Sequence, residues 1–208
     1  VCLFSILRFE LEREVGSMSD SSRPKRIGIT LGDPAGIGPE LALRVASEWR
    51  RGQEAKLFLI GDDRLLGRVG RALGLEVPPS IAAEDMAKTS LEVATVSIEE
   101  RALEDLVPGQ WSAATGAASY RWVKFAIESA QSGLLDAIVT GPIQKEAWHS
   151  AGVTFPGHTE MLAEMTGTDD YRMMLTSPEI SCVLVTIHVP LADVASVLTS
   201  EEVYRSVK

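Results

Sequence analysis

Short apolar runs rich in β-branched residues alternate with longer amphipathic runs along most of the chain. The short runs predict strands, and the longer runs, with apolar positions three and four residues apart, predict helices. Strands are expected at 26–31, 56–60, 91–96, 136–140, 172–176 and 182–188. Helices are expected at 39–50, 64–73, 115–132, 144–150, 159–165 and 191–198. Such alternation is typical of an α/β fold with a largely parallel sheet.

The last two predicted strands interrupt this alternation. In "MMLTSPEISCVLVTI" only Ser-Pro-Glu separates two apolar runs, which indicates an antiparallel pair or a long turn. The stretch 76–90 contains Pro78 and Pro79 and is predicted to be a surface connection.

Composition narrows the class of protein. The chain has 208 residues, of which 45% are hydrophobic and 24% charged, an ordinary globular composition for one large domain or part of a two-domain protein. Its net charge of −9 argues against nucleic acid or an anionic membrane as a partner. Cys2 and Cys182 lack metal-type spacing, and Cys182 is predicted to be a buried thiol in a cytoplasmic protein.

The first residues have a different character. The apolar run in 1–17 is too short to span a membrane and lacks the basic start of a secretory signal. Met18 precedes a polar stretch and resembles a natural start. Residues 1–24 are therefore expected to be a non-native or disordered extension with a weak helix at most, and ordered structure is expected from near Lys25.

A glycine-rich stretch, "ITLGDPAGIGPEL" (29–41), joins the first predicted strand to the first helix. A P-loop would place Gly and Lys where Ile37 and Gly38 stand, and a dinucleotide-binding loop would need glycine at Leu41. Pro39 suits the first turn of a helix. Two interpretations stay open: a tight turn without a ligand, or a backbone that approaches one.

Polar residues also follow other predicted strands. Gly61-Asp62-Asp63 follows the second strand and Thr140-Gly141-Pro142 the fourth. Ligands of open α/β sheets bind outside the carboxyl ends of the strands, so these ends could share one cleft. The alternative is that they are ordinary turns.

The three histidines differ in context. His149 stands near a helix end and is predicted to be a surface residue. His158 follows a Pro-Gly turn and opens a helix, where imidazole and the Thr159 hydroxyl could help to hold an anion. His188 follows an apolar run, where a hydrogen-bonded core histidine is more common than a ligand.

Three segments together resemble a known family. They are "TLGDPAGIGPEL", "VTGPIQKEAWHSAGVTFPGHTEML" and "RMMLTSPEISCVLVTIHVPLADV", and they resemble signature segments of the 4-hydroxythreonine-4-phosphate dehydrogenase family of vitamin B6 biosynthesis. The first is also similar to the glycine-rich loop of isopropylmalate and isocitrate dehydrogenases, whose fold that family shares. The resemblance implies an incomplete three-layer α/β/α fold, with a first lobe at about 25–150 and the start of a second at 151–208.

The resemblance also implies a reaction and a set of site residues. His158 and Thr159 would contact the substrate, Lys145 would lie near its phosphate or carboxylate, and His188 would be one of three histidine ligands to a divalent metal (zinc, magnesium, manganese or cobalt). NAD or NADP would oxidise 4-phosphohydroxy-L-threonine, and the β-keto acid would lose carbon dioxide to give 3-amino-2-oxopropyl phosphate. The resemblance identifies no catalytic or cofactor-binding residue here.

Family members continue past the equivalent of Lys208, and the other metal histidines and much of the cofactor-binding and homodimer-forming region lie there. The chain is therefore expected to be roughly the first two thirds of the enzyme and inactive alone. Other substrates remain open, namely 4-phosphoerythronate or a ring dihydrodiol carboxylate. A phosphate acyltransferase and a non-catalytic anion-binding remnant remain as alternatives to a dehydrogenase.

Overall fold

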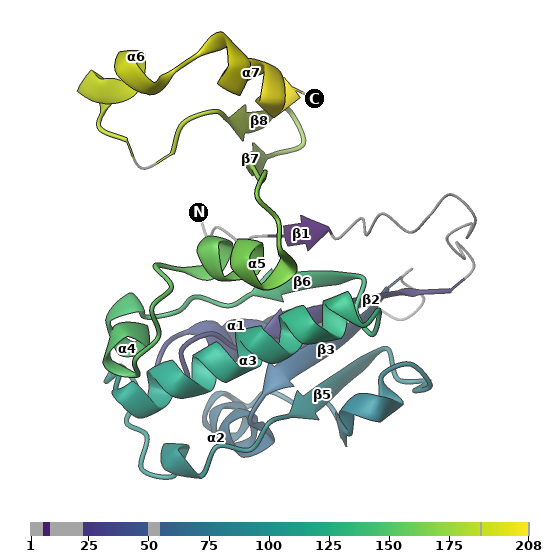
Figure 1. Ribbon diagram of the computed structural model, residues 1–208. Helices are drawn as coiled ribbons and strands as arrows, with labels where there is room; N and C mark the ends of the chain where they lie inside the picture. Colours follow the sequence, from purple (N-terminus) through teal and green to yellow (C-terminus); the bar gives the residue numbers. More distant parts are fainter. Residues whose placement is uncertain (1–5, 9–22, 50–54, 188, 208) are drawn as a thin grey trace. The chain divides into compact units, whose positions relative to one another are not determined.

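The computed structural model describes residues 6–8, 23–49, 55–187 and 189–207 (Figure 1). The chain divides into two compact units, Val1–Thr166 and Gly167–Lys208. The helix before the division buries Met161 and Leu162 in the core of unit 1. The lobe boundary expected near residue 150 stays a prediction.

Unit 1 is built on a six-stranded sheet of order β1-β6-β2-β3-β5-β4. The strands are β1 (Ile6–Arg8), β2 (Lys25–Thr30), β3 (Ala55–Gly61), β4 (Ser80–Ile81), β5 (Val93–Ser97) and β6 (Ala137–Thr140). All neighbours are parallel except β1, which pairs antiparallel with β6. The predicted parallel sheet is confirmed.

Helices cover both faces of this sheet. They are α1 (Gly38–Glu48), α2 (Asp63–Leu73), α3 (Ala113–Gln131), α4 (Lys145–Ser150) and α5 (His158–Thr166), with 3-10 turns η1 (Ala83–Asp85) and η2 (Arg101–Leu103). Right-handed crossovers place α1 and α2 on one face and α3 on the other. Figure 1 shows α3 crossing in front of the sheet, with α1 behind it. The predicted three-layer α/β/α fold is confirmed.

The core follows from the apolar runs. Leu57–Ile60 in β3 is buried on both faces, as a central parallel strand requires. Trp122 and Ile127 of α3 are also buried completely. Ser112 and Thr115 form a capping box that starts α3.

Unit 2 is small and open. It contains β7 (Met173–Thr176), β8 (Ser181–Leu184), the 3-10 turn η3 (Leu191–Asp193), α6 (Val194–Val197) and α7 (Ser200–Val207). β7 and β8 are antiparallel, which confirms the first of the two alternatives for this segment. None of the described residues of unit 2 is buried.

The structure corrects several expectations. Cys182 is exposed rather than buried, because no described residue forms a layer over this two-stranded sheet and its side chains are open to solvent. Ile6–Arg8 forms a strand where at most a weak helix was expected, since the edge of β6 offers backbone hydrogen bonds. The predicted helix 191–198 is split into η3 and α6, and α7 was not predicted. No helix among the described residues is long and apolar enough to cross a membrane.

Candidate functional site

The winding of the sheet reverses beside β2. The crossover from β2 through α1 leads to β3 on one side, whereas the crossover from β5 through α3 leads to β6 on the other side. The carboxyl ends of β2 and β6 therefore flank a topological switch point, the usual ligand position in an open α/β sheet. The glycine-rich loop follows β2, and the loop 141–144 follows β6.

The two loops at this switch point are in direct backbone contact. The Asp33 N–H donates to the Pro142 carbonyl at 2.8 Å, and the Gly141 N–H donates to the Thr30 carbonyl at 3.0 Å. Gly32 has a φ of 70°, and a Cβ there would stand 2.3 Å from the Pro142 oxygen. Packing against the second loop thus accounts for Gly32 without any ligand.

The rest of the glycine-rich loop divides into a packed part and an open part. A Cβ at Gly38 would stand 1.9 Å from the Leu31 carbonyl oxygen, so glycine is required there for packing as well. Gly36 and Ile37 are exposed, and a Cβ at Gly36 would meet nothing closer than 3.4 Å. Only this short exposed segment is open to a ligand.

Three predicted site residues come together at two neighbouring helix starts. Lys145 begins α4, and His158 and Thr159 begin α5. A Cβ at Gly157 would stand 3.9 Å from the Lys145 Nζ, so the ammonium group lies over the turn that precedes His158. Their role as substrate ligands stays a prediction.

His158 has an unusual environment. The residue as a whole is half-buried, but its Nε2 is covered completely and has no hydrogen-bond partner among the described residues. Burial, with a smaller contribution from the positive charge of Lys145, lowers the pKa of His158 from 6.5 to about 4. The imidazole is therefore neutral near pH 7. Its ring meets the Trp148 ring at an angle of 80°, with the centroids 5.6 Å apart.

The other two histidines lie elsewhere or outside the described residues. His149 is exposed on α4, as predicted. His188 lies outside the described residues, so its proposed role as a metal ligand stays a prediction. Within the described ranges, no three histidine, cysteine, aspartate or glutamate side chains gather closely enough to hold a metal ion.

For Asp62, just after β3, the sequence left open a shared cleft or an ordinary turn, and the structure gives it a structural role. It is 2% exposed, and its carboxylate accepts hydrogen bonds from the Leu65 and Glu100 N–H groups and from Arg64. Burial alone would raise the pKa of Asp62, but these bonds hold it below its ordinary value. Asp62 thereby caps α2 and ties it to the segment after β5.

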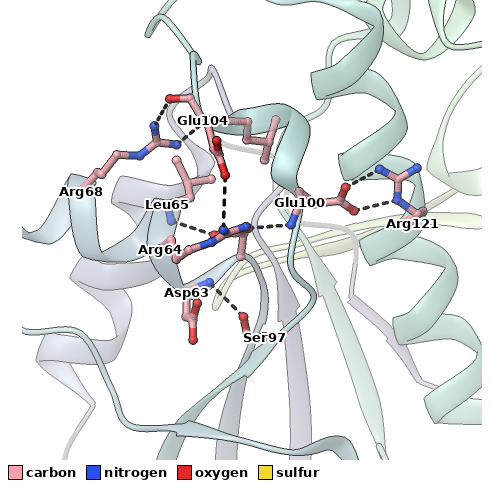
Figure 2. A network of polar contacts seen from close by, with 10 residues as sticks. Asp63, Arg64, Leu65, Arg68, Ser97, Glu100, Glu104 and Arg121 are labelled. Carbon is pink, nitrogen blue, oxygen red and sulfur yellow. Dashed lines mark hydrogen bonds and ion pairs between the residues drawn. The ribbon is translucent and has the colours of Figure 1, made fainter.

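Figure 2 shows the polar network around this cap. Arg68 donates to the Leu103 and Glu104 carbonyls, and Arg121 forms a bidentate ion pair with Glu100. A hollow of about 670 Å³ adjoins the network and is lined by three arginines and four carboxylates. Because these charges nearly balance and the arginines Arg64 and Arg68 bond internally, the network stabilises the fold and offers no clear anion site.

Comparison with known proteins agrees with the family resemblance found in the sequence, and it does so along most of the chain. Residues 53–208 match the family model described as "Pyridoxal phosphate biosynthetic protein PdxA". The 4-hydroxythreonine-4-phosphate dehydrogenase of Desulfosudis oleivorans is 38% identical over 180 residues, which cover 85% of this chain and 53% of the relative. The D-threonate 4-phosphate dehydrogenase of Cupriavidus necator is 38% identical over 170 residues, 80% of this chain and 50% of the relative.

The fold of this chain also agrees with that of a solved structure. A crystal structure of a 4-hydroxythreonine-4-phosphate dehydrogenase from Burkholderia phymatum superimposes with a TM-score of 0.78 at 36% identity, over 89% of this chain and 57% of that one. The chain thus spans about half the length of the curated relatives it matches.

Proposed function

The chain belongs to the family of the pyridoxal phosphate biosynthetic protein PdxA, and from this membership we propose that it contributes the substrate-binding helix starts of a dehydrogenase acting on 4-phosphohydroxy-L-threonine. The enzyme would use NAD or NADP to oxidise the secondary alcohol, and the product would lose carbon dioxide to give 3-amino-2-oxopropyl phosphate. The observation that carries this proposal is the convergence of Lys145, directly after the loop 141–144 at the switch point, with the start of α5, which carries His158 and Thr159.

The described residues suit an anionic, hydroxylated substrate. The Lys145 ammonium group and the N–H groups of the first turn of α5 offer positive charge to a phosphate or carboxylate, and the Glu160 carboxylate of the same turn opposes it. Because its Nε2 is covered completely, the neutral His158 ring can bond a substrate hydroxyl only through Nδ1, and it does so without adding charge. The Thr159 hydroxyl, one residue further along α5, can donate or accept a second bond. Together these groups would hold the substrate in one orientation.

A bound nicotinamide would supply the hydride acceptor, which no side chain can provide. The described residues do not form a metal site by themselves. The metal part of the proposal rests on the resemblance at His188 and on ligands from outside this chain.

Equilibrium binding tests the proposal directly. Isothermal titration calorimetry with 4-phosphohydroxy-L-threonine would compare the unmodified chain with Lys145→Ala and His158→Ala, and with His149→Ala as the exposed control. Loss of the charge-assisted bond in Lys145→Ala should weaken binding about tenfold or more, and loss of the neutral bond in His158→Ala should weaken it roughly three- to tenfold. His149→Ala should bind as the unmodified chain does. Equal affinity of His158→Ala and the unmodified chain would contradict the proposal.

D-threonate 4-phosphate is a second candidate substrate, because the Cupriavidus necator relative is as similar as the Desulfosudis oleivorans one. It carries a hydroxyl group where 4-phosphohydroxy-L-threonine carries an amino group. Titration of the same chain with both compounds would rank them. Tighter binding of D-threonate 4-phosphate would favour the second candidate.

A further inference from the structure

The buried side chain of Trp148 connects His158 to helix α3. Trp148 is 1% exposed, and its indole N–H donates to the Ser119 Oγ at 2.7 Å. Ser119 in turn donates to the Gly116 carbonyl one turn earlier in α3, at 3.0 Å. On its other side, the Trp148 ring meets the His158 ring at close to a right angle. A continuous line of contacts therefore runs from the backbone of α3 to His158.

The backbone beneath this line is held rigidly. A Cβ at Gly116 would stand 2.0 Å from the Ala147 carbonyl oxygen, so α3 and α4 touch backbone to backbone at this point. Ala147 is 1% exposed and directly precedes Trp148. The position of the Trp148 Cα is thus fixed by helix packing, and the direction of its ring is fixed by the bond to Ser119.

His158 lacks a comparable anchor of its own. Its Nε2 is covered and has no hydrogen-bond partner among the described residues, so no such bond fixes the ring from that side. Packing against the neighbouring ring has to fix it instead, and aromatic pairs at a right angle with centroids near this separation are favourable contacts.

We propose that Trp148, held by Ser119, is the positioning residue that sets the orientation of the His158 ring for substrate binding. This inference rests on the proposed function, in which His158 contacts the substrate. A second buried tryptophan shows that an indole N–H in this core can be buried without a hydrogen-bond partner. Trp122, which lies in α3, is fully buried, and its Nε1 has no hydrogen-bond partner among the described residues. Packing alone holds the Trp122 ring in the core, whereas the Trp148 ring is also held by its hydrogen bond to Ser119.

Two variants and two matched controls test the role. Ser119→Ala removes the acceptor, and Trp148→Phe removes the donor but keeps an aromatic ring. The controls are Ser129→Ala and Trp122→Phe, which change a buried serine and a buried tryptophan of the same helix. The first readout is the NMR resonance of the His158 Cε1–H, assigned by its disappearance in His158→Ala. It requires no substrate.

The expected result is a shift of this resonance by a few tenths of a part per million in Ser119→Ala and Trp148→Phe, and no shift in either control. The double variant should shift it no further than Trp148→Phe alone, because both changes remove the same bond. Affinity for 4-phosphohydroxy-L-threonine should fall about tenfold in both test variants. The controls should lose stability only.

The outcomes separate this inference from the proposed function. An unchanged His158 resonance in Ser119→Ala overturns the positioning role, and this variant is the milder of the two if Trp148→Phe fails to fold. A shifted resonance together with unchanged affinity in His158→Ala overturns the substrate role of His158 and leaves its dependence on Trp148 in place. A similar shift in Trp122→Phe would show a general loosening of α3 and would also overturn the positioning role.

Discussion

Replacing His158 by glutamine should make the folded chain less sensitive to mild acid. The pKa of His158 is lowered on folding from 6.5 to about 4, because the ring is buried and lies near Lys145. The unfolded chain therefore binds a proton at this position between pH 6.5 and pH 4, where the folded chain does not. Stability that is fully present above pH 6.5 is lost as the pH falls through this window.

The size of the effect follows from the two pKa values. At pH 7 the unfolded chain is only slightly protonated at this position, and the cost to folding is about 0.2 kcal/mol. At pH 5 the unfolded histidine is almost fully protonated while the folded one is mostly neutral, and the cost rises to about 2 kcal/mol. His158→Gln removes this pH-dependent cost to folding, because glutamine does not titrate.

Urea unfolding at pH 7 and pH 5, followed by tryptophan fluorescence, would measure the effect. Between these two values the unmodified chain should lose about 2 kcal/mol more than His158→Gln. His149→Gln is the matched control, because His149 is exposed and should follow the unmodified chain. Carboxylates with lowered pKa values, such as Asp62 and Asp136, are common to all three proteins and cancel. An equal pH dependence of the unmodified chain and His158→Gln would refute the reasoning.

Three further predictions concern packing and exposure. Gly38→Ala should cost more than about 3 kcal/mol in urea unfolding, because its Cβ would overlap a backbone oxygen, while Gly36→Ala should change stability by less than about 1 kcal/mol. Asp62→Ala should lower the free energy of unfolding by about 2 to 4 kcal/mol through the lost helix cap and buried bonds, and Asp63→Ala by less than about 1 kcal/mol. Equal losses of stability in the two variants would contradict the role of Asp62 as the cap of α2. Maleimide should label Cys182 within minutes in the folded chain, as peptide mass spectrometry would show, and protection without denaturant would mean that the thiol is buried.

Local sequence patterns were sufficient for β2, β3, β5 and β6 of unit 1, but they missed the short strands β1 and β4 at the two edges of the sheet. Strands such as β3 are apolar over most of their length because both faces of a central parallel strand are covered, and that pattern can be recognised from the sequence alone. The glycine-rich loop was harder to interpret. Its spacing excluded two phosphate loops, but only the contact of Gly32 with Pro142 shows that packing requires the glycine.

Features set by distant contacts could not be predicted. The bond from Trp148 to Ser119 joins residues on different helices, and no local pattern marks either of them. Asp62 resembled a cleft residue because its role as a cap depends partly on Glu100 in another segment. The exposure of Cys182 depends on the absence of a covering layer over β8 among the described residues, which an apolar run cannot reveal.

The strand order has a consequence for the timing of folding during synthesis. β2 pairs with β3 soon after the ribosome produces both, but its other neighbour, β6, comes much later. The Gly141 N–H that bonds the Thr30 side chain lies 111 positions further along the chain. At translation rates of about 5 to 20 residues per second, this edge of β2 stays unpaired for roughly 5 to 20 seconds. A nascent chain that stalls in this interval would present an apolar parallel edge to other chains, and the two loops at the switch point would be among the last parts of unit 1 to form.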